Sequence, residues 1–296
     1  MTAPIVYLLA LTPAVIWGFT PILSKRGMAG GGSSLQAALT VVLVDTSWYL
    51  LALFVMEGTN AFVDLPPKAI GVFLAAGIVG TALGRLAIFT GIDRVGASVN
   101  TAAVSVRPVF ATLLAVVVLG EAVGTTTALG IVVLVGGLLA LAASEGGDLA
   151  GWEPRELLFP LFAALFFAIG NVARRFGLLA FSEVHLLEAV ALNEFGGILA
   201  LVAYAVAAGR ADVFRAPRRT YLYFAGSGTL TAVALLALFA ALQRGKIAIV
   251  DPLAATAPLF ATVFAAVLLR DLEKVTRGVV VGAALVAIGV GIITGL

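Results

Sequence analysis

The sequence repeats itself at a distance of 150 residues. Residues 77–121 read GIVGTALGRLAIFTGIDRVGASVNTAAVSVRPVFATLLAVVVLGE, and residues 227–271 align with them without a gap as SGTLTAVALLALFAALQRGKIAIVDPLAATAPLFATVFAAVLLRD. Shared apolar composition explains paired alanines and leucines more easily than paired prolines and arginines. The identical pairs include Thr81/Thr231, Ala82/Ala232, Phe89/Phe239, Arg94/Arg244, Pro108/Pro258, Phe110/Phe260, Ala111/Ala261 and Thr112/Thr262. The chain therefore consists of two related halves.

Composition indicates what surrounds the chain. Of the 296 residues, 61% are hydrophobic and only 11% are charged, whereas an ordinary soluble domain carries about 25% charged residues. A single soluble core cannot bury this much apolar surface, and a soluble protein with so few charges aggregates. We therefore expect lipid to surround most of the chain.

The same counts exclude several kinds of site. The chain has no cysteine and one histidine, His185, so we expect no metal site and no cofactor. A net charge of +2 is not the footprint of a nucleic-acid-binding protein. The sequence lacks a GxxxxGK loop, so we expect no direct use of ATP. A coupling proton or ion stays open.

Ten apolar runs are long enough to span a bilayer, which takes roughly 20 helical residues. They cover 4–24, 35–56, 69–92, 97–119, 125–143, 157–178, 184–206, 221–242, 247–269 and 277–295. The sequence predicts an all-α, multi-pass integral protein of the cell membrane with ten transmembrane helices.

Each half of the chain holds five of these helices. An odd number of crossings turns the second half upside down relative to the first. We divide the chain into a first five-helix repeat at 1–145, a polar linker at 146–156 and a second five-helix repeat at 157–296. Two inverted halves can rock about a central site and open it to each side in turn, which is typical of secondary transporters.

Short motifs in both halves carry a family resemblance. They are Trp17-Gly18 with Lys25, Gly91–Ser98 and Arg107–Glu121 in the first half, and Phe166 with Arg174, Pro258–Thr262 and Leu269–Asp271 in the second. In these motifs the whole chain resembles the EamA family of the drug/metabolite transporter superfamily. The resemblance implies two inverted five-helix units and a carrier of small organic solutes, commonly an exporter of amino acids or related metabolites.

Three charged residues depart from that family pattern. Asp45 stands where a basic residue is frequent, and Arg85 and Arg107 stand where apolar residues are more usual. The resemblance therefore does not identify the substrate.

Polar side chains within the apolar runs are candidates for a substrate site. Asp45, Arg107 and Glu194 lie mid-run, where an ionised group costs roughly 2.5–3.5 kcal/mol, so each needs a partner or a wet cavity. Arginine grips a carboxylate or phosphate through two hydrogen bonds, and a buried acid binds an amine or a coupling proton. The full set of candidates is Trp17, Asp45, Arg85, Arg107, Asn171, Asn193 and Glu194.

These candidates also have a structural interpretation. Asp45 would pair with Arg85 or Arg107 to join helices, Asn171 would bond a neighbouring helix, and Trp17 would pack against protein or lipid. Both interpretations stay open.

Two further sets of residues have positions that suggest a role. Pro108 and Pro258 lie deep in two helices, where proline removes a backbone hydrogen bond, and we interpret them as hinges or as tolerated kinks. His185 is expected at the membrane interface, and the pairs Lys25-Arg26 and Arg174-Arg175 are expected to be interfacial anchors.

Charge and resemblance disagree about orientation. Links after odd-numbered helices hold eleven Lys and Arg residues and links after even-numbered helices hold five, so the positive-inside rule puts both termini outside. The resemblance implies that both termini are cytoplasmic.

Together these observations favour a secondary transporter that exports small organic metabolites by alternating access around a midplane cavity. The alternatives are an efflux carrier for drugs or lipophilic cations, an intramembrane enzyme and a passive channel. We expect no enzymatic activity, since the sequence lacks DDxxD and DxxxD clusters. The expected partners are a small organic solute and the bilayer, and the oligomeric state is not indicated.

Overall fold

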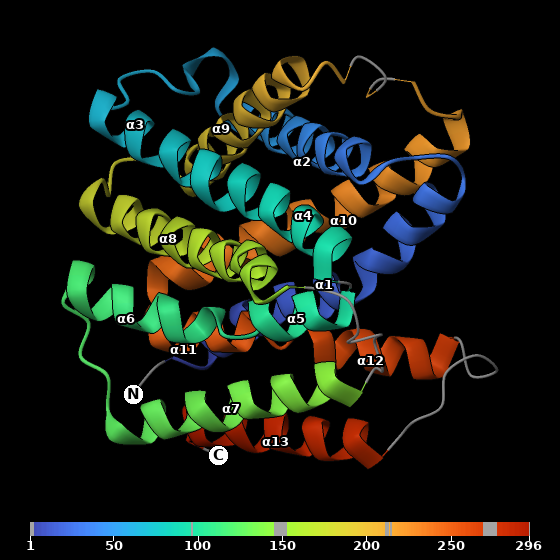
Figure 1. The fold of residues 1–296 in the computed structure, drawn as a ribbon. Coiled ribbons are helices and arrows are strands. Elements are labelled where there is room, and N and C mark those ends of the chain that lie inside the picture. The colour runs from blue at the N-terminus through green and yellow to red at the C-terminus, as the bar shows by residue number, and fades with distance from the viewer. Residues whose placement is uncertain are drawn as a thin grey trace.

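The computed structural model describes residues 3–95, 97–144, 153–210, 213, 215–268 and 277–295. Most of these residues are helical (Figure 1). The expected polar linker at 146–156 falls outside the described residues except for its last four positions.

Both halves fold into the expected helices. The first half contains α1 (Pro4–Ala29), α2 (Ser34–Glu57), the short 3-10 helix η1 (Gly58–Asn60), α3 (Pro67–Ala76), the π-helical segment η2 (Gly77–Leu83), α4 (Gly84–Val95), α5 (Ala97–Val104), α6 (Arg107–Leu119) and α7 (Thr125–Ser144). The second half contains η3 (Pro154–Leu157), α8 (Leu158–Ala180), α9 (Leu186–Ala207), α10 (Arg218–Arg244), α11 (Ile247–Ala254), α12 (Ala257–Leu268) and α13 (Arg277–Thr294).

Several of these helices combine into single membrane crossings. Within the described ranges, nine helical stretches are long and apolar enough to cross a bilayer, and Val280–Thr294 forms a shorter apolar helix. The third crossing joins α3, η2 and α4, the fourth joins α5 and α6, and the ninth joins α11 and α12. The all-α membrane fold of two inverted five-helix repeats is confirmed.

The fourth and ninth crossings are broken at matched places. α5 ends at Val104 and α6 begins at Arg107, while α11 ends at Ala254 and α12 begins at Ala257. Pro108 and Pro258 therefore lie in the first turn of a new helix, where a missing amide proton costs nothing. Of the two interpretations, hinge or tolerated kink, a kink within a continuous helix does not apply, because each proline follows a break between two helices. Discontinuous helices at repeat interfaces are typical of transporter binding sites.

Helices of one repeat pack mainly on helices of the other. α1 packs along α10, and the inverted equivalent of this contact is that of α8 with α3 and α4. α2 packs against α9, and α7 packs along α13 at the edge of the bundle (Figure 1). The two repeats therefore form one interlocked body whose interior is lined by both.

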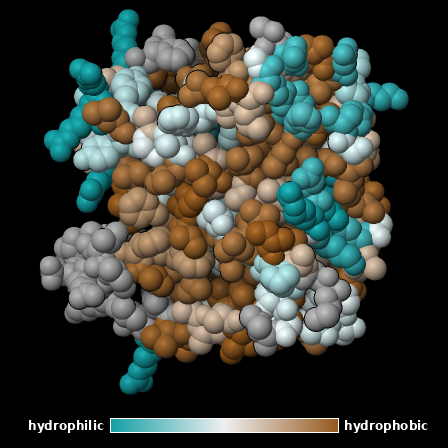
Figure 2. All heavy atoms as spheres, turned by 180° about the vertical axis from the view of Figure 1, so that it is seen from behind, coloured by the Kyte–Doolittle hydropathy of each residue, from teal (hydrophilic) through white to brown (hydrophobic). Residues whose placement is uncertain are grey.

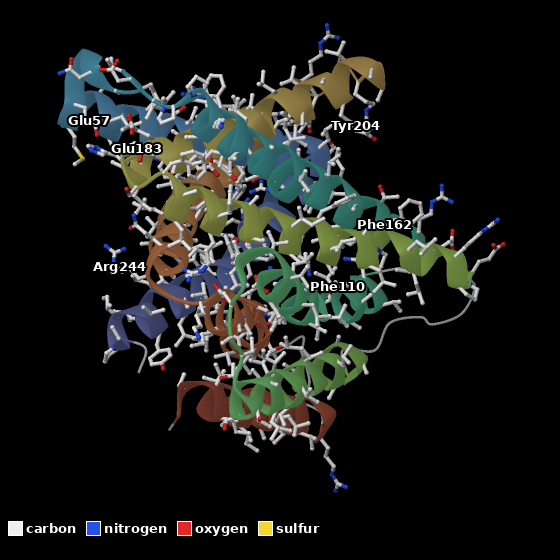
Figure 3. All side chains as sticks on the ribbon, turned by 90° about the vertical axis from the view of Figure 1, so that its left-hand side faces the viewer. Glu57, Phe110, Phe162, Glu183, Tyr204 and Arg244 are labelled. Atoms are coloured by element: carbon white, nitrogen blue, oxygen red, sulfur yellow. The ribbon has the colours of Figure 1, made fainter. Side chains whose placement is uncertain are left out.

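The course of the chain defines two opposite faces of the bundle. Both termini lie at the left of Figure 1, on the face that we call the terminal face. In Figure 3, Glu57, Glu183 and Arg244 lie at one end of the bundle and Tyr204 and Phe162 lie towards the other. This is the arrangement that two inverted five-helix units require.

Apolar side chains cover the middle of the outer surface. Figure 2 shows brown residues across the centre of the rear face and teal residues gathered at its left and right sides. Large side chains such as Phe54, Leu113 and Val117 are exposed. Such a surface is stable only in contact with lipid.

Close approach of two helices depends on Gly77, the first residue of η2. A Cβ atom at this position would lie only 1.6 Å from the backbone oxygen of Asn193 in α9. Because backbone atoms cannot yield as a flexible side chain does, α9 can approach the third crossing only where that side chain is missing. The π-helical turn that follows places Thr81 among the buried residues.

We predict that Gly77→Ala destabilises the protein by about 1–3 kcal/mol, the usual effect of overpacking a filled interior. Gly71→Ala is the matched control in the same crossing, since its Cβ would meet no atom within 4 Å. Thermal unfolding in detergent measures both. Equal unfolding temperatures for the two variants would contradict the close approach.

Candidate functional site

Arg107 is the first residue of α6, and its partner is an acid in the other repeat. The Arg107 Nε donates to Asp251 Oδ2 at 3.2 Å, and one terminal nitrogen lies 3.5 Å from the Asp251 backbone oxygen. Asn171 Nδ2 donates to the other carboxylate oxygen of Asp251 at 2.5 Å. Asp251 is fully buried, whereas the Arg107 side chain is 15% exposed. The ion pair joins α6 to α11, and the hydrogen bond from Asn171 adds α8.

Arg174 in α8 is buried, contrary to the expectation that it anchors the chain at the interface. Its guanidinium donates to Asn193 Oδ1 at 2.9 Å, to Asn171 Oδ1 at 2.8 Å and to Thr81 Oγ1 at 3.1 Å. It also lies 5.5 Å from the centre of the Phe239 ring. The expectation was wrong because the guanidinium points into the bundle, where Thr81, Asn171 and Asn193 bind it, and not towards the end of the helix.

Glu194 in α9 accepts hydrogen bonds from Thr81 and Asn193, which also bind Arg174. Its Oε1 accepts from Thr81 Oγ1 at 3.0 Å and from Asn193 Nδ2 at 2.6 Å. The single Thr81 proton is used on Glu194, while its oxygen accepts from Arg174 and from Asn193. The connected residues form what we call the buried polar network: Thr81, Arg107, Asn171, Arg174, Asn193, Glu194 and Asp251.

Asp45 lies beside this network on α2. It is fully buried, and the charges of Glu194 in α9 and Arg85 in α4 act on it. Its Oδ2 has no hydrogen-bond partner. The proposed ion pair of Asp45 with Arg107 is not formed, since Arg107 is bound to Asp251, and the influence of Arg85 on Asp45 is electrostatic at longer range.

The structure therefore brings most of the candidate residues together. Arg107, Asn171, Asn193 and Glu194 belong to one network, and Asp45 and Arg85 lie next to it. Trp17 is half-buried and packs against the apolar core, so its role as a wall of the substrate site stays a prediction. The hinge role of Pro108 and Pro258 also stays a prediction.

Sequence reasoning missed Asp251, Thr81 and the central place of Arg174. Asp251 lies within the expected apolar run at 247–269 and is not among the candidate residues. The available signal was an acid next to Pro252 inside that run. Thr81 carried the signal of an identical pair with Thr231.

A second cluster closes the terminal face between the repeats. Glu121 follows α6, is buried, and accepts a hydrogen bond from Arg175 Nε in α8. Its other oxygen accepts from the backbone amide of Ile247 at 2.9 Å, and Arg175 also donates to the carbonyl of Leu242. Arg175 therefore joins α8 to the ends of α6 and α10, and its role as an interfacial anchor stays a prediction.

His185 lies on the same face, immediately before α9. Its Nδ1 is 2.7 Å from Glu57 Oε1 at the end of α2. The hydrogen bond and the charge of Glu57 raise the pKa of His185 above its ordinary value. The His185 side chain is 67% exposed, and its position at the membrane interface stays a prediction.

Fold and site define a class of protein. A helical bundle of inverted repeats, with broken helices and charged side chains buried between the repeats, is the architecture of secondary transporters. The family model described as the EamA-like transporter family matches residues 4–143 and 155–295. The chain belongs to this family and is a multi-pass membrane protein.

Comparison with other proteins adds to the assignment of the fold. A solved crystal structure superposes with a TM-score of 0.77 at 16% sequence identity, covering 98% of this chain and 96% of the other. At this identity the likeness establishes the fold alone. No match was found among curated proteins.

We predict that the Arg107–Asp251 pair is the most sensitive contact of the network. Asp251→Leu leaves the guanidinium and the Asn171 amide without their acceptor, and removing one partner of a buried pair costs about 3–5 kcal/mol. The double variant Arg107→Met/Asp251→Leu is expected to recover most of this loss. Denaturant unfolding in detergent measures each variant.

Arg94→Gln is the control for this experiment. Arg94 pairs with Glu156 at 3.5 Å, but its side chain is 59% exposed, so its loss should cost at most about 1 kcal/mol. A double variant as unstable as Asp251→Leu alone would contradict the account.

Proposed function

We propose that this protein is a secondary transporter of the cell membrane that exports small organic metabolites, such as amino acids or related solutes, by alternating access. The observation that carries the proposal is the buried polar network. Residues of both repeats contribute to it, and Arg107 is the first residue after the break in the fourth crossing.

The chemistry of the network suits a solute with both a negative and a positive group. Arg107 is the partly exposed arginine of the network, and its planar fork matches a carboxylate. Buried acids, Asp45, Glu194 and Asp251, lie on or beside the network and match an amine. An amino acid presents both groups at the spacing of one carbon atom.

Alternating access requires contacts that can be exchanged between the two repeats. The Arg107–Asp251 pair joins α6 of the first repeat to α11 of the second, so a relative movement of the repeats changes it directly. We expect the breaks before Pro108 and Pro258 to absorb part of the movement, because two short helices can tilt separately where one long helix cannot.

The same site would accept a second class of solute. Asp45 and Glu194 each present an oxygen without a hydrogen-bond partner, which would favour a lipophilic cation and efflux of drugs. We propose no catalytic activity and no cofactor, and membership of a transporter family favours transport over a passive channel or an intramembrane enzyme.

Ligand-induced stabilisation tests the proposal first. Purified protein is screened by thermal shift against amino acids, organic and phosphorylated acids, nucleosides and lipophilic cations. A solute at about 100 times its Kd stabilises the native state by about 2.7 kcal/mol. We expect a carboxylate-bearing amino acid or relative to be a hit, and we expect Arg107→Gln to abolish its effect while Arg94→Gln preserves it.

Flux in liposomes decides between transport and mere binding. The hit should be carried at a rate that saturates with concentration, and Arg107→Gln should remove most of that flux. Hits only among lipophilic cations, lost in Glu194→Gln, would replace metabolite export by drug efflux. Conductance that never saturates would overturn the transporter proposal.

A further inference from the structure

Two carboxyl groups on neighbouring helices are fully buried with incomplete hydrogen bonding. Asp45 Oδ2 and Glu194 Oε2 both lack a hydrogen-bond partner, and both residues are fully buried. They come from α2 and α9, which pack against each other, and the charge of Glu194 acts directly on Asp45. A buried acceptor without a donor costs about 1–3 kcal/mol, and more when it is charged.

We propose that Asp45 and Glu194 share one exchangeable proton. A carboxyl group that holds a proton becomes a hydrogen-bond donor, and the neighbouring carboxylate offers the acceptor. One proton therefore reduces the repulsion between the two acids and supplies the missing donor. Such a proton belongs to the pair rather than to either residue.

The surrounding hydrogen bonds place the negative charge on Glu194. Its Oε1 already accepts from Thr81 and Asn193. Asp45 Oδ1 lies 3.5 Å from the Thr46 hydroxyl, but that hydroxyl donates to the carbonyl of Val42 at 2.6 Å. Glu194 is thus better provided with side-chain donors, so the proton resides mainly on Asp45.

Other charged and titratable groups around the pair come from three helices. Arg85 acts from α4, Arg174 acts from α8, and Tyr49 lies one turn from Asp45 on α2 with its hydroxyl bound to the carbonyl of Ala232. α10 contributes no charge at this depth, because its only charged residues stand at its two ends. Among the described residues, neither arginine donates a hydrogen bond to Asp45 or Glu194, so the proton is the missing donor.

The pair is also connected to the network that we propose as the substrate site, and the proton's role in coupling rests on that proposed function. Glu194 reaches Arg174 through Thr81 and Asn193, and Arg174 reaches Asp251 through Asn171. Adding the proton neutralises one of the two carboxylates, so the net charge of the site becomes more positive and favours an anionic solute. Removing it favours a cationic one.

Infrared spectroscopy of the full-length protein in liposomes tests the proton site without any substrate. A protonated carboxyl group has its own carbonyl-stretching band, which shifts in heavy water. We expect this band at acidic to neutral pH and its loss at alkaline pH, with release of one proton per chain. We expect Asp45→Asn to abolish the band, because Asp45 carries the proton. We expect Glu194→Gln to shift the frequency of the band, because the proton of the buried Asp45 then meets an amide in place of a carboxylate.

Glu188→Gln is the matched control. Glu188 is a buried acid on the same helix, and both its oxygens accept backbone donors, from Phe62 and His185, so the band should persist in this variant. A band that survives in Asp45→Asn, a band with unchanged frequency in Glu194→Gln, or no titrating band in the wild type would overturn the proposal. Thermal unfolding confirms that each variant is folded. Loss of flux with an intact band would count against the proposed function alone.

Discussion

The position of one guanidinium group constrains much of the interior. Arg174 lies inside a helix bundle that is surrounded by apolar surface, where an unpaired charge is too costly to keep. Thr81, Asn171 and Asn193 satisfy it from three different crossings. These partners in turn hold Glu194 and Asp251, so one charge organises contacts across both repeats. The helices can pack this closely because Gly77 leaves room for the backbone of α9.

The interior is symmetric in shape, because the two repeats are inverted copies of one fold. Its charged side chains are not symmetric. The broken helices, the paired prolines and the packing of α1 on α10 and of α8 on the third crossing all have counterparts in the other repeat. The charges do not, because Arg85 and Arg107 align with Leu235 and Ala257. The repeats therefore provide a common scaffold, while the side chains inside it differ between the halves.

The sequence predicts the scaffold better than the site. Hydrophobic runs and the repeat identify the helices and their inversion, because lipid imposes both length and composition on every crossing. The sequence does not predict which buried side chains pair with each other. Arg107 and Asp251 are 144 residues apart, and only packing between the repeats brings them together. The sequence shows Arg174 beside Arg175 as a pair of expected anchors, but it does not show that the Arg174 side chain points into the bundle, where polar partners bind it.

Access to the interior from both sides is the central claim, and the absence of cysteine from the sequence allows a direct test. Ser105 is buried at the break before α6, and its hydroxyl donates to the carbonyl of Thr101. Ser47 makes the same kind of local bond on the exposed, lipid-facing side of α2. We predict that Ser105→Cys in sealed vesicles reacts with a membrane-impermeant maleimide added from either side, whereas Ser47→Cys reacts from neither. Reaction of Ser105→Cys from one side only, or from neither, would contradict alternating access.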